Sequence, residues 1–383
     1  MRSLEQILED ETGTDAVPSA AAAYATREGV QFLGAAGFRC LASGDPLEPD
    51  AIFRIASMTK AITSVAALQL VEAGRVGLDD EMSRYLPELG DRPVLEGFDE
   101  AGVPRLRPAH TPITLRKLLT HTSGFGYQFL NADLQRSAES GIVGDLFSGD
   151  DAFFNSPLIH EPGSTWEYGI STDWVGRLIE TLSGGSLGDY CRTHIFEPLG
   201  LGDTAFDLHC EKHPRLVTVH HRDPAGSLRE DPDDPPPDAS FHAGGHGLYS
   251  TASDYLRFLQ AVLRGGELDG ARILSDAMVA EAGRDHIAPL RTGPWKSVDG
   301  AHCNDVDAFA GAQFGLGFVI NPEPLPTGRS PGSLAWAGLF NSYFWIDPHR
   351  GVAGVFLSQI LPFYDPRAVA LSQAFETAVY EAL

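Results

Sequence analysis

The sequence predicts an α/β protein of the α+β type, with an antiparallel sheet that is built from both chain ends and flanked by helices. Strand-like runs occur near the beginning of the chain and again near its end, and the later runs are joined by links too short for crossover helices. Helical patterns and long polar loops occupy the sequence between them. We therefore expect a sheet domain from residues 1–75 and 309–383, a large, mostly helical inserted domain from 76–308, and an active site at their junction.

The first elements follow from local pattern. Apolar runs at 20–25 and 30–38 are separated by a polar, glycine-containing link at 27–29, which predicts a hairpin. A helix is predicted from about residue 57 to 73, because the composition is helical and Gly74 supplies a stop signal.

The middle and the end of the chain differ in periodicity. The helical patterns of the middle region lie at 114–119, 173–182, 187–196 and 253–263. An acidic, proline-rich stretch at 231–238 can continue neither a helix nor an inner strand. The predicted strands of the last part are 315–320, 333–338, 342–346 and 352–358, followed by a final helix at about 368–382.

Composition excludes several classes of partner. The 383 residues include 28 basic and 52 acidic side chains, so the formal net charge is −24. Such a surface repels nucleic acid and anionic membranes, and no apolar run is long enough to span a bilayer. Four scattered cysteines without C-x-x-C spacing indicate free thiols in a reducing compartment, so we expect a cytoplasmic protein. The oligomeric state is left open.

One short pattern contains a candidate nucleophile and a candidate base. Ser57 and Lys60 are three residues apart at the start of the predicted helix and therefore share one face. An amine at that distance can take the hydroxyl proton, and a helix N-terminus favours the developing negative charge. The alternative is a capping or surface serine followed by a solvated lysine.

A third proton-carrying group and an oxyanion site are needed beside such a pair. Tyr168 follows a Pro-Gly turn and precedes a predicted helix, which places its phenol on a loop, although tyrosines in such positions also serve as core residues. The backbone N–H of Leu339, after the Trp336-Ala337-Gly338 strand, could pair with that of Ser57 to form an oxyanion hole. The alternative for this strand is an ordinary core strand.

These pieces together resemble the serine β-lactamase and penicillin-binding-protein superfamily, most closely the class C β-lactamase-like esterases called family VIII carboxylesterases. The matching segments are Ser57-x-x-Lys60, the Tyr168 motif, the Trp336-Ala337-Gly338 triplet, and the segments 118–125, 197–201 and 244–254. They are ordered along nearly the whole chain, from about residue 20 to 360.

The resemblance implies a β-lactamase-like fold and a serine hydrolase without cofactor or metal. Ser57 would be the nucleophile, and Lys60 with Tyr168 the joint base, with burial and mutual charge lowering the proton affinity of both. The substrates would be carboxylic esters of small, largely apolar molecules, cleaved through an acyl-Ser57 intermediate. His121 would be structural, with its ring hydrogen-bonded within its own turn. The expected substrate-binding residues are Trp336, Ala337, Gly338, Phe125, Tyr127 and Ile170.

Two departures from the lactamase pattern matter for specificity. The Trp336-Ala337-Gly338 triplet stands where class C lactamases carry Lys-Thr-Gly, and Ile170 stands where they carry asparagine. The lost cation and amide favour neutral esters over carboxylated lactams, so we expect weak or no lactamase activity. Arg291 or Arg329 could still supply a cation from a loop.

Other functions remain open. Amide or oligomer hydrolysis, acyl transfer or weak lactam hydrolysis would use the same site, and a non-catalytic penicillin-binding-like sensor is the alternative of another class. Two G-x-S-x-G strings, around Ser186 and Ser330, are interpreted as a helix cap and a turn rather than nucleophile elbows. The histidines show no zinc-ligand spacing.

Overall fold

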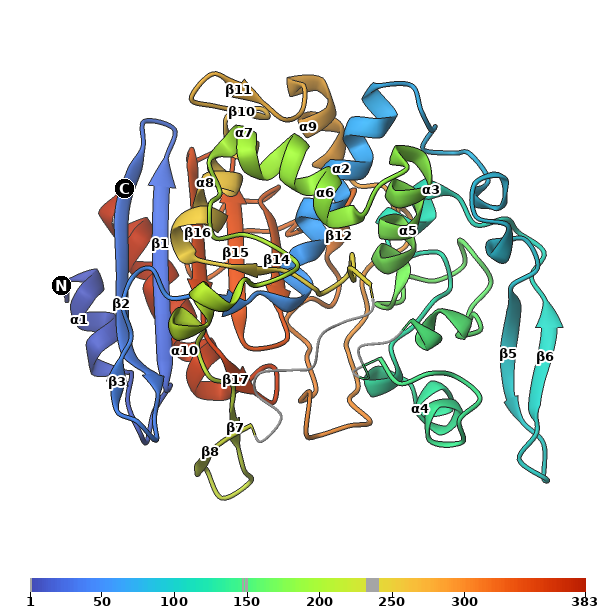
Figure 1. Ribbon diagram of the computed structural model, residues 1–383, viewed down its shortest axis with the longest axis horizontal. Coiled ribbons are helices and arrows are strands. Elements are labelled where there is room, and N and C mark those ends of the chain that lie inside the picture. The colour runs from blue at the N-terminus through green and yellow to red at the C-terminus, as the bar shows by residue number, and fades with distance from the viewer. Residues whose placement is uncertain (1, 147, 149–150, 232–240) are drawn as a thin grey trace.

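An eight-stranded antiparallel sheet forms the centre of the computed structural model, which describes residues 2–146, 148, 151–231 and 241–383 (Figure 1). Its strand order is β12-β13-β14-β15-β16-β1-β2-β3, so the two ends of the chain meet where β1 pairs with β16. The predicted fold class is confirmed. The strands are β1 (Ser19–Thr26), β2 (Val30–Cys40), β3 (Asp45–Pro46), β12 (Gln313–Phe314), β13 (Val319–Ile320), β14 (Leu334–Gly338), β15 (Ser342–Asp347) and β16 (Val352–Leu357).

The sheet contains the predicted hairpin and three of the four predicted late strands. Short links make β14, β15 and β16 antiparallel neighbours, as their sequence spacing indicates. The single strand predicted at 315–320 is wrong, because β12 and β13 are joined by a tight turn. Gly317 in that turn has a positive φ of 97°, and a Cβ there would overlap the Ser64 hydroxyl. The turn therefore packs directly on the helix that follows Ser57.

Helices cover both faces of the sheet. The adjacent residues Phe344 and Trp345 of β15 point to opposite faces, as strand geometry requires. Phe344 contacts Tyr255 of α8 (Ala252–Leu263), with ring centroids 5.5 Å apart. Trp345 contacts Phe375 of α10 (Pro366–Ala382) on the other face, at 6.2 Å. Helix α1 (Leu4–Asp10) packs beside α10 and against β2.

The helical region lies beside this layered part in Figure 1 and is attached to it through α2 (Thr59–Glu72). Eleven of the 14 residues of α2 are buried, because α5 (Ser171–Ser183) and α6 (Leu187–Cys191) pack against it and its Ser64 contacts the turn between β12 and β13. Its main helical neighbour is α5, which begins two residues before the helix predicted at 173–182. The remaining α-helices are α3 (Leu115–Leu119), α4 (Ala132–Glu139), α7 (Glu197–Leu199) and α9 (Asp276–Ala282).

Short elements complete the described chain. The small strands are β4 (Phe53–Arg54) with β9 (Tyr249–Ser250), β5 (Pro93–Phe98) with β6 (Pro104–Pro108), β10 (Glu267–Leu268) with β11 (Ala271–Arg272), and β17 (Ile360–Leu361), β7 (His220–Arg222) and β8 (Leu228–Glu230) together. The 3₁₀ turns are η1 (Ala56–Met58), η2 (Met82–Arg84), η3 (Pro87–Leu89), η4 (Gln128–Leu130), η5 (Ala152–Asn155) and η7 (Cys210–Arg215), and η6 (Arg192–Phe196) is a π-helical continuation of α6.

Three sequence expectations concern segments outside the sheet. Ser186 caps α6 and accepts a hydrogen bond from the Asp189 N–H at 3.0 Å, so that interpretation is confirmed. Most of the acidic loop at 231–238 lies outside the described residues, and the division into two domains stays a prediction. No helix in the described ranges has the length and apolarity needed to cross a membrane.

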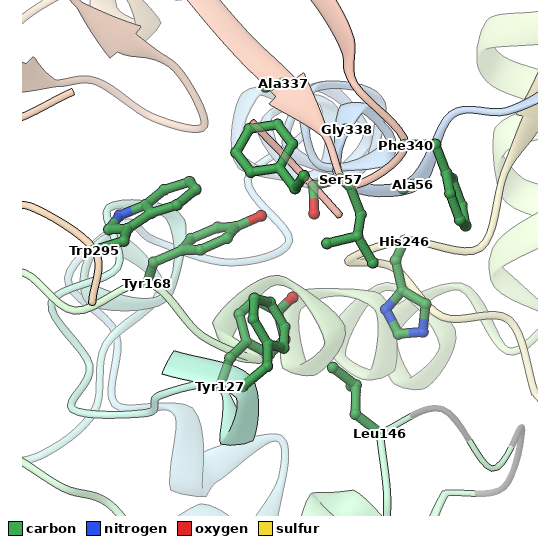
Figure 2. Close-up of a pocket in the computed structure, with 13 residues that line it drawn as sticks. Ala56, Ser57, Tyr127, Leu146, Tyr168, His246, Trp295, Ala337, Gly338 and Phe340 are labelled. Carbon is green, nitrogen blue, oxygen red and sulfur yellow. The ribbon is translucent and has the colours of Figure 1, made fainter. Parts of the chain in front are cut away.

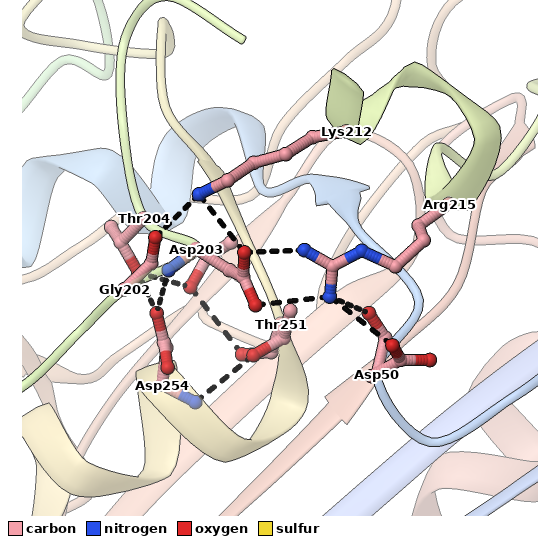
Figure 3. Close-up of polar contacts among 9 residues, drawn as sticks. Asp50, Gly202, Asp203, Thr204, Lys212, Arg215, Thr251 and Asp254 are labelled. Carbon is pink, nitrogen blue, oxygen red and sulfur yellow. Dashed lines mark hydrogen bonds and ion pairs between the residues drawn. The ribbon is translucent and has the colours of Figure 1, made fainter. Parts of the chain in front are cut away.

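A polar network fixes the start of α8 (Figure 3). The Asp254 carboxylate accepts hydrogen bonds from the Asp203 N–H at 2.7 Å and the Thr204 hydroxyl at 3.1 Å. Asp203 in turn forms ion pairs with Lys212 at 3.0 Å and with Arg215. The network therefore holds the helix turn that carries Tyr255, which contacts the site described next.

Candidate active site

Ser57 lies on the tight turn η1 rather than on the helix itself, because α2 begins only at Thr59. Ala56, immediately before it, has a φ of +43°, a left-handed conformation that costs a non-glycine residue about 1–3 kcal/mol. Two hydrogen bonds hold the turn: Ile55 N–H donates to the Leu248 carbonyl at 3.0 Å, and the Tyr255 hydroxyl donates to the Met58 carbonyl at 2.8 Å. The surrounding fold thus maintains a strained backbone at the predicted nucleophile.

The Lys60 amine lies directly beside the Ser57 hydroxyl. Its Nζ is 3.1 Å from Ser57 Oγ, 2.9 Å from the Tyr127 hydroxyl and 2.7 Å from the Gly245 carbonyl oxygen. Three acceptors match the three protons of an ammonium group, so the amine is held in one position. The structure brings the serine and the lysine together as the sequence spacing predicts.

Burial changes the protonation of Lys60. The side chain is 1% exposed, and this desolvation lowers its pKa to about 7, while the charge of Asp173 opposes the shift. A substantial fraction of the amine is therefore neutral near neutral pH. In that form its lone pair can accept the Ser57 proton across the 3.1 Å contact.

Tyr168 brings a phenol to the same point. It is 4% exposed, its hydroxyl is hydrogen-bonded to Ser57 and to the Trp336 indole, and the centre of its ring is 4.8 Å from Lys60 Nζ. Its loop packs closely on the 118–125 segment, since a Cβ at Gly169 would overlap the Phe125 carbonyl oxygen. The three residues expected to carry the chemistry thus converge, and Figure 2 shows Tyr168 pointing toward Ser57.

The expectation that burial lowers the proton affinity of both groups is wrong for the phenol. Desolvation raises the pKa of Tyr168, because the buried form that it disfavours is the phenolate, whereas for lysine it is the ammonium. The hydrogen bonds from Ser57 and Trp336 only partly oppose this shift. At neutral pH the geometry therefore presents a partly neutral amine as the base and a protonated phenol as a proton donor or relay.

Tyr127 contacts the Lys60 amine directly, whereas only a contact with substrate was predicted for it. Its hydroxyl accepts a hydrogen bond from Lys60, and burial raises its pKa well above the usual value for a phenol. Its ring packs edge-on against that of Tyr168 with centroids 5.0 Å apart. Two phenols therefore flank one lysine, and the sequence showed only that Tyr127 follows the 118–125 segment.

The two amides expected to form an oxyanion hole lie at one wall of the pocket. Ser57 and Leu339 both line it, and no hydrogen bond of the described residues uses either backbone N–H. β14 reaches η1 closely because Gly338 lacks a side chain: a Cβ there would overlap the Ile55 carbonyl oxygen. The missing side chain at Gly338 therefore lets β14 approach η1, and Gly338 itself also lines the pocket.

Replacing Gly338 with alanine tests this close approach. The added methyl group must push β14 away from η1, so we expect kcat to fall by about 10- to 100-fold and the free energy of unfolding by about 1–3 kcal/mol. Steady-state ester kinetics and denaturant unfolding measure the two effects. Gly185→Ala is the matched control, since a Cβ at that exposed position meets no atom within 4 Å. Equal behaviour of the two variants would contradict the proposed role of the glycine.

The pocket itself is small and largely apolar. It has a volume of about 120 Å³. Its lining residues are Ala56, Ser57, Tyr127, Phe129, Leu146, Tyr168, His246, Trp295, Ala337, Gly338, Leu339, Phe340 and Phe363. Figure 2 shows Trp295 and Tyr168 on one side of Ser57 and His246 on the other. Of the expected substrate-binding residues, Tyr127, Ala337 and Gly338 line this pocket.

The other three expected contacts are buried behind the lining. Trp336 packs edge-on against Tyr168 at 5.0 Å, and Phe125 stacks with Trp174 at 5.9 Å. Ile170 is 3% exposed at the start of α5. None of the three lines the pocket, because each supports the segment that carries a catalytic candidate. The apolar walls of the pocket come from loops that are far apart in the sequence, so no local sequence pattern shows that they meet.

His121 is buried in an aromatic cluster instead of acting on the nucleophile. Its ring contacts those of Trp166, Tyr168, Phe314 and Trp336. The prediction that the ring is hydrogen-bonded within its own turn is wrong for Nδ1, because this atom has no hydrogen-bond partner among the described residues. Burial and the nearby Lys60 charge lower its pKa well below the usual value, so the ring is neutral and supports Tyr168 by packing.

Two candidate cations are absent from the pocket lining. Arg329 forms a two-pronged ion pair with Glu376 at 2.7 and 2.6 Å, and Arg291 pairs with Asp285 at 3.1 Å. Neither can meet a substrate carboxylate without losing its partner. Among the described residues, no group of three His, Cys, Asp or Glu side chains is arranged to hold a metal ion.

Asp173, in the first turn of α5, is a site residue that the sequence analysis did not single out. Its side chain is fully buried, and its Oδ1 accepts the Gly245 N–H at 2.8 Å. It is also the charge that opposes the lowered pKa of Lys60.

Comparisons with known proteins agree with this geometry. The model of the family described as Beta-lactamase matches residues 4–378. Monacolin J acid methylbutanoyltransferase of Aspergillus terreus is 34% identical over 354 residues, which cover 88% of this chain and 83% of that protein. Lovastatin esterase of Penicillium rubens is 31% identical over 366 residues, or 90% of each chain. The structure of simvastatin synthase from Aspergillus terreus (LovD6 mutant) superposes with a TM-score of 0.86 at 31% identity, over 99% of this chain and 96% of that one.

Proposed function

The chain belongs to the beta-lactamase family, and on that premise we propose that it cleaves small, largely apolar carboxylic esters through an acyl ester on Ser57. The predicted superfamily resemblance is confirmed, and the chain is an enzyme of the ester-cleaving and acyl-transferring branch that its relatives represent. The narrower assignments, to family VIII and to the carboxylesterase class, are part of the proposal.

The first half-reaction acylates Ser57. The neutral Lys60 amine takes the Ser57 proton, and the oxygen attacks the ester carbonyl carbon. The backbone N–H groups of Ser57 and Leu339 donate hydrogen bonds to the carbonyl oxygen and stabilise the negative charge that develops on it. The bond to the leaving alkoxide then breaks, and the proton held by Lys60 reaches that oxygen through the Tyr168 hydroxyl. The products are acyl-Ser57 and a free alcohol.

The second half-reaction reverses these roles. An acceptor hydroxyl, from water or from an alcohol, gives its proton to the same Lys60–Tyr168 pair while its oxygen attacks the acyl carbonyl. The bond between Ser57 Oγ and the acyl carbon breaks, and Oγ regains the proton. Water yields a carboxylic acid, whereas an alcohol yields a new ester.

One observation carries the proposal: the buried Lys60, with a pKa of about 7, contacts both the Ser57 hydroxyl and the Tyr127 phenol at the wall of a cavity. A desolvated amine is costly for a fold, so its presence at a cavity indicates a catalytic role. A non-catalytic sensor would have no use for this arrangement.

Acyl transfer to an alcohol is the second candidate, favoured by a specific feature. The lining contains several aromatic and aliphatic side chains and few polar ones, which suits an apolar acceptor better than water. The names of the relatives include both a methylbutanoyltransferase and an esterase, which supports either outcome. For lactams we propose weak or no activity, because Arg291 and Arg329 are both engaged in ion pairs away from the pocket.

Mass spectrometry of the intact protein tests the proposal directly. During turnover of p-nitrophenyl butanoate, we expect the mass of one butanoyl group to appear on the protein and to map to the peptide that contains Ser57. Adding a short alcohol should then divide the acyl group between acid and ester products. Turnover without any covalent intermediate on that peptide would contradict the assignment.

A further inference from the structure

His246 is a polar group of the pocket that the acylation chemistry does not use. It lines the cavity on the side of Ser57 away from Trp295 and Tyr168 (Figure 2). Leu146 and Phe340, which lie on the same side of Ser57 in Figure 2, are apolar. An imidazole therefore interrupts an otherwise apolar wall beside the predicted nucleophile.

The backbone around His246 is fixed to the helices of the site. The Thr63 hydroxyl donates to the Gly244 carbonyl at 2.8 Å, and the Gly245 carbonyl accepts the Lys60 contact at 2.7 Å. The Gly245 N–H donates to Asp173 at 2.8 Å. The loop is thereby tied to both α2 and α5, so the imidazole has a defined position relative to Ser57.

The ring lies close to a fully buried carboxylate. His246 Nδ1 is 3.5 Å from Asp173 Oδ1, a distance at which the two attract without a well-formed hydrogen bond. Asp173 Oδ2 and His246 Nδ1 have no hydrogen-bond partner in the described part of the chain. A carboxylate on the Nδ1 side favours the tautomer with its proton there, which leaves Nε2 as a hydrogen-bond acceptor.

Burial is the main cause that favours the neutral form of the His246 ring. Burial lowers the pKa of His246, Lys60 acts in the same direction, and Asp173 opposes them. A neutral imidazole can accept a hydrogen bond from a hydroxyl group, which an imidazolium cannot do.

We infer that His246 binds the acyl acceptor. Its imidazole accepts a hydrogen bond from the hydroxyl of an alcohol with an apolar body and holds that oxygen beside acyl-Ser57. Leu146, Leu339 and Phe340 contact the apolar body, which gives such an alcohol an advantage over water. When the oxygen attacks, the hydroxyl turns its single proton from His246 to the Lys60–Tyr168 pair, so His246 acts on acceptor choice and placement before the attack. This inference rests on the proposed function, because it requires an acyl-Ser57 intermediate.

Partitioning of the acyl group tests the inference. Wild type and His246→Phe are acylated with p-nitrophenyl butanoate in the presence of benzyl alcohol. The release of p-nitrophenol reports acylation, and chromatography gives the ratio of benzyl butanoate to butanoic acid. Both products come from the same acyl-Ser57, so their ratio does not depend on the acylation rate. We expect His246→Phe to lower the ester-to-acid ratio by about five- to tenfold, which corresponds to the loss of one hydrogen bond. His246→Gln, which keeps an acceptor atom, should recover part of the ratio.

His242→Gln is the matched control, because His242 lies in the same loop but contacts Asp207 and Gly188 outside the pocket. Its ester-to-acid ratio should equal that of wild type. An unchanged ratio in His246→Phe, or an equal loss in His242→Gln, would overturn the inference and leave the proposed function intact. A wild-type protein that forms no acyl-Ser57 would overturn both.

Discussion

Replacing Ser57 with alanine should lower kcat/KM for a chromogenic short-chain ester by at least about 10⁴-fold. Every bond-making step of the proposed cycle passes through Oγ, and Lys60 Nζ, only 3.1 Å away, then has no hydroxyl to deprotonate. The remaining amides and pocket can still bind the ester, so we expect KM to change much less than kcat. Initial rates at saturating and limiting ester concentration separate the two effects.

The chain supplies a matched control for this substitution. Ser186 is the central serine of a G-x-S-x-G string, and its hydroxyl caps α6 and contacts the Asp189 carboxylate at 2.8 Å. Ser186→Ala should cost about 1 kcal/mol of stability through the lost cap and leave kcat unchanged. Turnover that survives in Ser57→Ala but disappears in Ser186→Ala would refute the assigned nucleophile. A metal chelator should have no effect on either protein.

Replacing Lys60 with methionine should abolish turnover to a similar extent while making the fold more stable. Methionine has a similar length and no charge, so it fills the same buried space without the desolvation cost of an ammonium group. Ser57 keeps its hydroxyl but loses its base. We expect kcat/KM to fall by at least about 10⁴-fold.

The gain in stability should depend on pH in a defined direction. The pKa of Lys60 is about 7 in the folded chain, against an ordinary value of 10.5, so between these pH values the unfolded state binds more protons. The cost of the wild-type lysine is fully present below about pH 7 and disappears as the pH rises toward 10.5. Lys60→Met should therefore be more stable by about 4 kcal/mol at pH 7, and by progressively less as the pH rises.

Urea unfolding of both proteins at several pH values measures this difference. Lys117→Met is a suitable control, because this partly exposed lysine donates to the Pro112 carbonyl at 2.6 Å and does not line the pocket beside Ser57. A difference between Lys60→Met and wild type that grows with pH would contradict the lowered pKa.

The sheet could be predicted because its strands are marked locally. β14, β15 and β16 are short apolar runs separated by tight links, and such links permit only antiparallel neighbours. One sheet from both chain ends was predicted from the need to bury both sets of strands in one layer, whereas the pairing of β1 with β16 is known only from the structure. The segment at 315–320 was misjudged because alternation alone does not reveal that Gly317 adopts a positive φ against Ser64.

The site was predictable where its chemistry lies in one short pattern. The spacing of Ser57 and Lys60 places them together on any helix start, and the resemblance located Tyr168. Tyr127 and His246 reach the site from loops and Asp173 from the first turn of α5, and nothing in the local sequence reports that these three residues lie close together. Whether burial raises or lowers a pKa likewise depends on the surroundings, which is why the direction at Tyr168 was missed.

The order of the strands also has a consequence for how the protein becomes active during biosynthesis. The turn that carries Ser57 emerges from the ribosome early, whereas Leu339 and the strand that presses Gly338 against that turn are translated near the end. An incomplete chain therefore has a serine but neither its second amide donor nor the packing that holds the turn. Contacts between such distant segments form slowly and leave apolar strand edges uncovered meanwhile. Reactivity is thereby withheld until nearly the whole polypeptide has been made.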